Sequence, residues 1–378
     1  MTDKLRVRLY NIRFGDAVLV TVPDNGTTRH ILIDVGNVLS GKGGDDTVFK
    51  PVVEAIKAEL DGKPLDLYVM THEHMDHIQG LFFAKEKAAV ELDVDFAWIT
   101  ASAAPDYYDK HPNAKKKKLE AVAAYEQIAA YLDAAPDKTV EGLMLNNNPR
   151  STADCVTYLR GLADKTTFVH RGAPTDGTHP FEEAKLSIWG PEEDTSSYYR
   201  SFQPLALGVD DGGGAGAKPS VVTPFPPAGV DAGVFYNLVD SRRTGLHDNL
   251  LAIDKAANNT SIVFLLEWRG WKLLFPGDAE QESWRMMDEQ GVLEPVHLLK
   301  IAHHGSWNGT PQGATLDKIL PPTPADGRKR YAVVSTCLDT YNGVPDDDTL
   351  ALLGGRAELH STLDQIPDAG HIDVDLEG

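Results

Sequence analysis

The feature that most constrains the fold is a short apolar strand that runs directly into a cluster of ionisable residues. Residues 65–71 read LDLYVMT, a continuous apolar run typical of a strand buried on both faces. The next six residues, 72–77, are His-Glu-His-Met-Asp-His. In α/β proteins, ligand-bearing loops follow the carboxyl ends of such strands. The pattern therefore predicts an α/β protein with a functional site at this strand end.

The segment 72–77 has the composition of a metal site. Its four potential ligands are His72, His74, Asp76 and His77. Alternate residues of an extended loop point to one side, so the first two can face one ion, and the last two, on the following turn, can face a second. Imidazole suits Zn, and carboxylates add harder oxygen ligands. A purely structural role is disfavoured, because each polar group in a core would need its own partner.

Two later strands also end in metal-type residues. A hairpin of strands 261–267 and 271–275 leads into Pro276-Gly277-Asp278, and strand 296–302 leads into His303-His304-Gly305-Ser306. A lone Gly-Asp is more often an ordinary turn, but two cations need an anionic bridge. Gly305 permits a tight turn that aims one imidazole inward. The alternative for the His pair is one core and one surface histidine.

The remaining apolar segments predict a sandwich of sheets and helices. Further strands are expected at 5–10, 17–22, 30–35, 95–100, 185–190 and 331–336, and helices at 48–60, 114–134 and 281–290. They form two β-rich halves, each with helices, which favours a sheet-on-sheet core with helices outside. With 378 residues, 42% of them hydrophobic, the chain suits one large domain or two ordinary ones.

Three features leave alternatives open. Residues 203–235 are rich in Gly, Pro and Ala, so we expect a long loop, either a lid over the site or a surface excursion. Lys115 to Lys118 could bind phosphate, but a solvated helix face is favoured. Trp307 follows Ser306 and could equally line the pocket or pack within the fold.

Composition narrows the function classes. The formal charge of −20 repels nucleic-acid backbones unless a basic patch or bound cations reverse the field. No apolar run approaches 18 residues and the first residues lack the apolar core of a signal peptide, so neither a membrane span nor secretion is expected. Cys155 and Cys337 make no disulfide framework, so we expect buried structural thiols and a cytoplasmic protein.

The order of these motifs resembles the metallo-β-lactamase-fold hydrolases. The closest resemblance is to the branch with the hydrolase domain of bacterial competence DNA-uptake channels and the phosphorylcholine esterases. The matching motifs are Gly15-Asp16, Leu32-Ile33-Asp34-Val35-Gly36, His72-x-His74-x-Asp76-His77, Asn259-Thr260-Ser261, Gly277-Asp278 and His303-His304-Gly305-Ser306. They cover roughly residues 5–100 and 245–340. The resemblance implies a four-layer αββα sandwich in a single domain, 1–378, with an atypical region at about 101–244.

The resemblance also implies a pair of divalent metal ions, Zn or Mn. One ion would be held by His72, His74 and one histidine of the 303–304 pair, and the other by Asp76 and His77. Asp278 would bridge the two ions. Asp34 would orient a ligand histidine, and Asn259 and Ser261 would border the substrate.

The sequence departs from the family pattern at one position. Where the family has Gly-His-Pro after the last core strand, this chain has Gly343-Val344-Pro345. Either His360 or His371 substitutes for the family histidine, or the second site lacks a ligand and the protein binds a single ion.

The expected activity is metal-dependent hydrolysis. A water molecule activated by the metal ions would attack an ester or phosphodiester, Asp76 would orient it, and His303 or His304 would protonate the leaving oxygen. The resemblance favours a phosphodiesterase or nuclease, and the negative charge favours a cyclic nucleotide or a short single strand. The alternatives are a carboxylic-ester, lactone or phosphocholine-ester hydrolase, and a non-catalytic binding or regulatory protein. No membrane association is expected, and residues 101–244 could dock a protein partner.

Overall fold

The computed structural model describes most of the chain, in segments interrupted by short gaps and one long one. The described residues are 3–39, 41–134, 138–199, 248–324, 326–341, 343–364 and 366–378. The segment 203–235, for which a long loop was predicted, lies outside the described residues. No described helix is both long enough and apolar enough to cross a bilayer.

The first sheet contains the amino-terminal strands and the strand that precedes the His-rich motif. Its order is β13-β1-β2-β3-β4-β5-β6. Pairing is antiparallel from β13 to β3 and parallel from β3 to β6. The strands are β1 (Lys4–Tyr10), β2 (Val18–Asp24), β3 (Thr27–Ile33), β4 (Leu65–Met70), β5 (Val94–Thr100), β6 (Ala163–Val169) and β13 (His371–Glu377).

The second sheet contains the hairpin before Asp278 and the strand before the His pair. Its order is β12-β11-β10-β9-β8-β7, antiparallel from β7 to β9 and parallel from β9 to β12. The strands are β7 (Lys185–Gly190), β8 (Val263–Trp268), β9 (Trp271–Phe275), β10 (Leu298–Lys300), β11 (Tyr331–Val334) and β12 (Glu358–Ser361).

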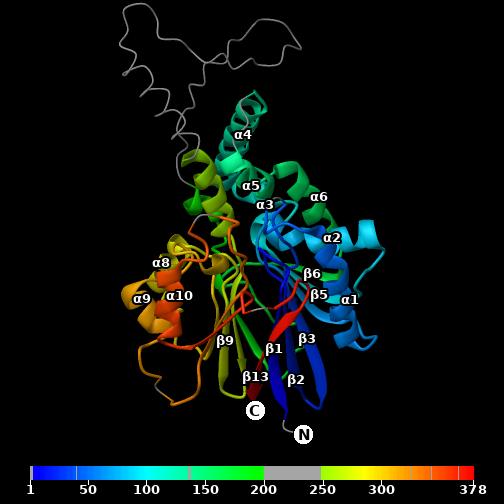
Figure 1. Cartoon of the computed structure of the whole chain (residues 1–378), viewed down its shortest axis with the longest axis vertical. Coiled ribbons are helices and arrows are strands. Elements are labelled where there is room, and N and C mark those ends of the chain that lie inside the picture. The colour runs from blue at the N-terminus through cyan, green and yellow to red at the C-terminus, as the bar shows by residue number, and fades with distance from the viewer. Residues whose placement is uncertain are drawn as a thin grey trace, which may run out of the picture.

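The two sheets face each other across one core, and helices cover their outer faces (Figure 1). Helices α1 (Phe49–Leu60), α2 (Met75–Ala88) and α6 (Pro149–Arg160) share a core with the first sheet. Helices α8 (Gln281–Glu289), α9 (Gly313–Ile319) and α10 (Asp347–Gly354) share a core with the second. This is a four-layer αββα sandwich, as predicted.

Side-chain alternation explains why the strands form this sandwich. In β1, Leu5, Val7 and Leu9 point into the core between the sheets, as expected for period-two burial. Arg6 and Arg8 point the other way and pair with carboxylates of β13. Helix α1 buries its apolar positions at helical spacing against the first sheet.

The atypical region contributes to both the sandwich and a helical subregion above it. Its strands β6 and β7 extend the two sheets at their edges. Helices α3 (Tyr107–Lys110), α4 (Pro112–Ala134) and α5 (Lys138–Asn146) precede β6 in the sequence and follow β5. Helices α4 and α5 share a small core with the helical segment 248–258. This core contains Tyr125 and Ile128 of α4, Val140 of α5, and Leu250.

The two cysteines differ in environment. Cys155 in α6 is buried, and burial raises the pKa of its thiol to about 12, so it is an inert structural thiol as predicted. Cys337 is only half-buried, so the prediction of two buried thiols is wrong for this residue. It follows the end of β11, where the chain turns out toward solvent.

Candidate metal centre

The centre lies where the chain passes from β4 into α2. The chain leaves β4 at Met70, and His74 adopts an extended conformation immediately before the helix. Asp76 and His77 therefore lie in the first turn of α2, where the sequence predicted only a turn. The first turn favours the carboxylate, because unpaired backbone N–H groups make a helix amino terminus positive.

Glycine at position 36 lets the chain after β3 touch this helix start. A Cβ at Gly36 would lie 2.5 Å from the carbonyl oxygen of Met75 and 2.6 Å from the backbone nitrogen of His77. Both contacts are far closer than any real Cβ contact, so only glycine fits. The backbone of Val35 is bonded to the same helix: its N–H donates to His77 O, and its oxygen accepts from Gly80 N.

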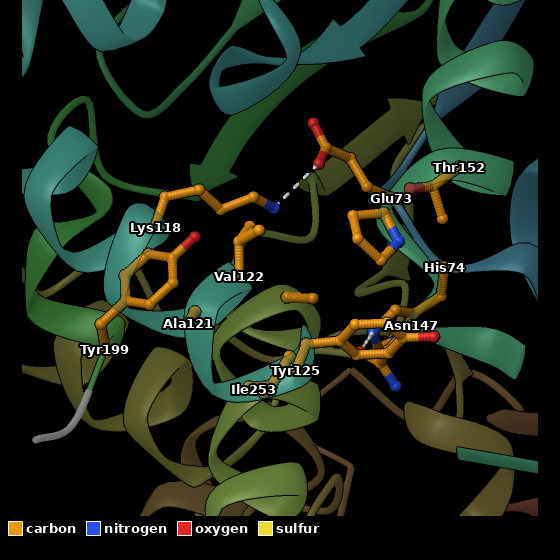
Figure 2. Close-up of a pocket in the computed structure, with 12 residues that line it drawn as sticks. Glu73, His74, Lys118, Ala121, Val122, Tyr125, Asn147, Thr152, Tyr199 and Ile253 are labelled. Carbon is orange, nitrogen blue, oxygen red and sulfur yellow. Dashed lines mark hydrogen bonds and ion pairs between the residues drawn. The ribbon is translucent and has the colours of Figure 1, made fainter. Parts of the chain in front are cut away.

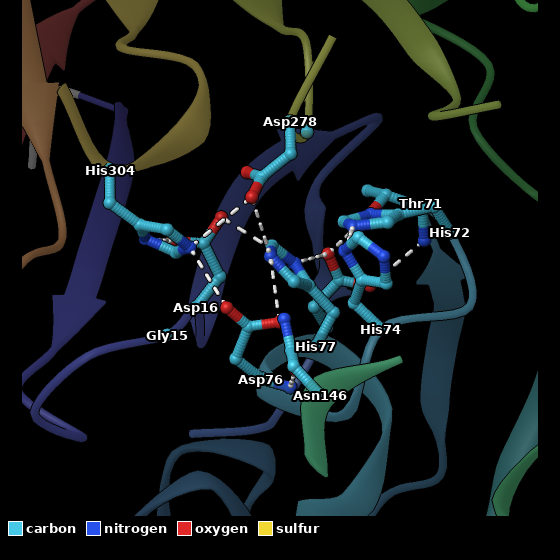
Figure 3. Close-up of polar contacts among 12 residues, drawn as sticks. Gly15, Asp16, Thr71, His72, His74, Asp76, His77, Asn146, Asp278 and His304 are labelled. Carbon is cyan, nitrogen blue, oxygen red and sulfur yellow. Dashed lines mark hydrogen bonds and ion pairs between the residues drawn. The ribbon is translucent and has the colours of Figure 1, made fainter. Parts of the chain in front are cut away.

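Four buried side chains from three regions of the chain converge on one point. They are Asp76, His77, Asp278 and His304, and each offers one ligand atom within 4.8 Å of all the others. Nε2 of His77 lies 3.1 Å from Asp278 Oδ2. Nε2 of His304 lies 3.2 Å from Asp278 Oδ2 and 3.4 Å from Asp76 Oδ2. Figure 3 shows the two carboxylates and His304 arranged around His77.

Each imidazole is oriented by a hydrogen bond on its far nitrogen. His77 Nδ1 donates to Asp34 Oδ2 at 2.8 Å, and Asp34 is itself fixed by the N–H and hydroxyl of Thr71. His304 Nδ1 donates to the carbonyl oxygen of Ser335 at 3.0 Å. Both rings therefore present Nε2 to the shared point, the arrangement that metal-binding histidines commonly have.

A buried ion pair adjoins the group. Lys300, at the end of β10, pairs with Asp16, and its Nζ lies 3.7 Å from Asp278 Oδ1. Both members are almost fully buried. Burial by itself would lower the pKa of Lys300, but Asp16 and Asp278 outweigh it and hold the pKa above its usual value. The sequence reading missed Lys300, although a lone lysine in an apolar strand was a usable signal.

The carboxylates and imidazoles shift one another's pKa values strongly. Burial opposes charge on every member of the group, but the neighbouring imidazoles outweigh it and lower the pKa of Asp76 to about 2. Asp278 and Asp76 likewise outweigh burial and raise the pKa of His304 to about 9. The same two carboxylates raise the pKa of His77 well above its usual value.

The group fits a divalent ion. Oδ1 of Asp76 and Nε2 of His304 are buried and have no hydrogen-bond partner within the described structure. Buried polar atoms are normally paired, so their convergence on one point indicates a missing ligand. Two carboxylates and two imidazoles form a mixed oxygen and nitrogen donor set that suits Zn or Mn.

The structure places His72 and His74 beside this group but not within it. His72 Nε2 lies 3.0 Å from His74 Nδ1, and His74 Nε2 lies 2.8 Å from Asn147 Oδ1. Figure 3 shows both rings on the far side of His77 from His304. The two histidines of the 303–304 pair also separate: His304 joins the Asp76 group, whereas His303 lies with Asp254 and Glu280.

Asn259 and Ser261, expected to border the substrate, hold the loop that carries Asp278. Ser261 Oγ accepts the backbone N–H of Asp278 at 3.0 Å. Asn259 Oδ1 accepts the N–H groups of Glu280 and Ser283. Asn259 also borders a surface hollow that Trp307 lines, and Trp307 is 59% exposed, so this tryptophan does not pack within the fold.

Neither candidate substitute for the family histidine reaches a metal-type cluster. His360 lies on β12 beside Glu358, and His371 lies on β13 beside Asp373. Within the described residues, the clusters of metal-type side chains contain neither histidine. Of the two alternatives for the histidine missing at Val344, the structure therefore does not support substitution by His360 or His371.

A small cavity of about 40 Å³ opens beside His74 (Figure 2). Lys118 and Tyr125 of α4 line it, together with Glu73 and Asn147. Lys118 Nζ lies 3.4 Å from Glu73 Oε2. The preference for a solvated lysine face is therefore wrong for Lys118, because only a third of its side chain is exposed. Nearby Tyr108, Tyr199 and Glu73 raise its pKa well above the usual value, although burial opposes this.

Comparisons with known proteins give no family assignment. No family model matches the sequence, and no curated protein matches it. Among solved structures, the chain is similar to "CmlA beta-hydroxylase E377D mutant", with 12% identity and a TM-score of 0.38. That match covers 99% of this chain, which spans about half (54%) of the β-hydroxylase chain.

Proposed function

We propose that the protein is a metal-dependent hydrolase of the metallo-β-lactamase fold that cleaves phosphodiester bonds in nucleotides or short single strands. The observation that carries the proposal is the buried group of Asp76, His77, Asp278 and His304, whose ligand atoms lie within 4.8 Å of one another. The motif resemblance to the competence-protein branch supports the phosphodiester substrate.

The proposed metal ligands are the four members of this group. They would hold a divalent ion, which would polarise a phosphoryl oxygen and acidify a water molecule. Through the hydrogen bonds on their far nitrogens, Asp34 and Ser335 orient the imidazoles of His77 and His304 so that both Nε2 atoms face the point where the ion would bind. Lys300, which pairs with Asp16, also places a positive charge 3.7 Å from Oδ1 of Asp278.

Lys118 supports an anionic substrate. It lines the cavity that His74 also borders, so a phosphate approaching the His-rich loop from that side meets a partly buried ammonium group. Its partner Glu73 would have to yield to the substrate or share the lysine with it. Since the whole chain carries a charge of −20, this local cation would favour a small anion over a long duplex.

The test compares phosphodiester and carboxylic-ester substrates in the same preparation. Protein reloaded with Mn²⁺ or Zn²⁺ is assayed against bis-p-nitrophenyl phosphate, cyclic dinucleotides, short single strands and p-nitrophenyl acetate. We expect phosphodiester turnover that Asp278→Asn reduces by at least about 100-fold, together with loss of bound metal. Ester turnover without phosphodiester turnover would contradict the substrate class.

Lys118→Met separates substrate recognition from chemistry. We expect a raised KM for phosphodiesters with kcat little changed, because the lysine would bind the ground state and the transition state alike. Lys116→Met is the matched control, since that lysine lies on the same helix and is exposed. An unchanged KM in Lys118→Met would remove the cavity from the proposal while leaving the metal group intact.

A further inference from the structure

A second cluster of ligand-type side chains lies outside the Asp76 group. Asp254, Glu280 and His303 each offer one ligand atom, and these atoms all lie within 4.8 Å of one another. They come from three separate segments: the helical residues 248–258, the loop before α8, and the short turn after β10. Packing alone has no need to bring two carboxylates together at such a junction.

The two carboxylates are buried without a strong cation. Asp254 and Glu280 are 6% and 4% exposed. Among the described residues, no lysine or arginine forms an ion pair with either of them. Their nearest ionisable neighbours are imidazoles, with His74 Nε2 3.7 Å from Asp254 and His303 Nδ1 3.5 Å from Glu280. Buried carboxylates are costly unless they are paired or bind a metal.

Asn258 gives a second, independent indication that the cluster binds a cation. It is fully buried, and its Nδ2 lies 2.9 Å from Glu280 Oε1, 3.3 Å from Asp254 Oδ2 and 3.4 Å from His303 Nε2. Its Oδ1 has no hydrogen-bond partner within the described structure. Rotating the amide by half a turn exchanges its oxygen and nitrogen. The unpartnered oxygen then faces the cluster, where it can act as a metal ligand.

We propose that Asp254, Glu280 and His303 bind a divalent cation, with the amide oxygen of Asn258 as an additional metal ligand. A doubly charged ion would neutralise the two buried carboxylates, and it would pair His303 Nδ1, which also has no hydrogen-bond partner among the described residues. Oxygen donors outnumber the single imidazole, which favours Mn²⁺ over softer metals.

This site goes beyond the proposed hydrolase function and does not depend on it. It shares no ligand with the Asp76 group. The two are neighbours, because the backbone N–H of His303 donates to Asp278 Oδ1 at 3.2 Å. A cation that holds His303 would thereby steady the turn that presents His304 to the other group.

The test is Mn²⁺ binding to the full chain after removal of metal with a chelator. Free Mn²⁺ is followed by electron paramagnetic resonance, and bound metal by elemental analysis after gel filtration. We expect Glu280→Gln and Asp254→Asn each to bind about one ion per chain fewer than the wild type. Glu289→Gln is the matched control, because this residue of α8 is exposed and pairs with Arg285 on the surface.

Further variants distinguish the two groups. Asp76→Asn is expected to lose the ion of the Asp76 group and keep the ion at Asp254. Pulsed resonance on that remaining ion should detect nitrogen coupling from one imidazole, a readout that works even if the Glu280 variant does not fold. Unchanged binding in both Glu280→Gln and Asp254→Asn overturns the proposal. So does coupling to two imidazoles, which would place the ion between His72 and His74 instead.

Discussion

The charges around His77 set a competition between protons and a metal ion. Asp76 and Asp278 raise the pKa values of His77 and His304, in each case against the opposing effect of burial. At neutral pH and without metal, both imidazoles therefore hold the protons that balance the two carboxylates. A divalent ion supplies the same two positive charges, so it must displace those protons in order to bind.

Metal binding should therefore release protons and strengthen as the pH rises. A histidine with a raised pKa is protonated below that value, and only the neutral ring is a ligand, so affinity should increase as the pH rises toward about 9, the pKa of His304. Isothermal calorimetry in buffers of different ionisation enthalpy measures the number of protons released. Affinity that is constant between about pH 6 and 9 would contradict this account.

Lys300 makes a second residue-scale prediction, on stability. Replacing it with Met deprives the buried Asp16 carboxylate of its lysine partner, which should lower the free energy of unfolding by about 3–5 kcal/mol. The double change Asp16→Asn with Lys300→Met should recover much of that loss, because both members of the ion pair are then neutral. Urea denaturation of the metal-free proteins measures both values. Equal losses in the single and double variants would show that the lysine acts through packing instead.

At the scale of elements, the site depends on how β3, β4 and α2 meet. The chain after β3 passes so close to the first turn of α2 that Gly36 has no room for a Cβ. The Asp34 carboxylate, two residues earlier, bonds His77 in that same turn. The geometry of the metal-type group is therefore a property of this junction rather than of the His-rich segment alone.

Gly36→Ala tests the junction. The added methyl would clash with backbone atoms of Met75 and His77, which cannot rotate away, so we expect a loss of about 1–3 kcal/mol and weaker metal binding. Gly161→Ala is the control, since its nearest neighbour would lie 3.7 Å away, an ordinary contact. Thermal unfolding and metal titration of both variants give the comparison. Normal metal affinity in a destabilised Gly36→Ala would mean that α2 adjusts without moving Asp76 and His77.

Helices and strands with a clear hydrophobic pattern in their own sequence were predictable. Strands such as β4 and β8 are continuous apolar runs, and α1 has helical spacing, so each was expected close to where it lies. Helix α2 was missed, because its buried face combines Asp76, His77 and Gln79 with apolar residues and so has no clear amphipathic pattern. The polar residues that the site requires replace the apolar residues that would otherwise mark the buried face of a helix.

Contacts between residues that are far apart in the sequence were harder to predict. Asp254 and Asn258 carry no motif, and only the fold brings their helical segment to Glu280 and His303. Which histidine of the 303–304 pair faces Asp76 depends on left-handed backbone at both positions, with φ of 47° and 53°. Spacing along a sequence does not encode such a turn, so the pair could be recognised but not divided between the two clusters.

At the scale of the whole molecule, net charge should govern which substrates reach the site. A chain with a charge of −20 repels a polyanion, and the repulsion weakens as salt shortens the screening length from about 30 Å at 0.01 M to about 8 Å at 0.15 M. If the protein cleaves oligonucleotides, kcat/KM for a 20-nucleotide strand should therefore rise with salt over this range. Proteins that bind nucleic acid through basic surfaces lose affinity with added salt instead.

The control for this salt dependence is a substrate of low charge. Cleavage of bis-p-nitrophenyl phosphate should change little over the same range of salt, because a single negative charge couples only weakly to the field of the protein. A steep fall of oligonucleotide cleavage with salt would point to a basic surface that dominates the approach of the substrate. The proposed preference for small anions would then be wrong, and long nucleic acids would become the substrates to test.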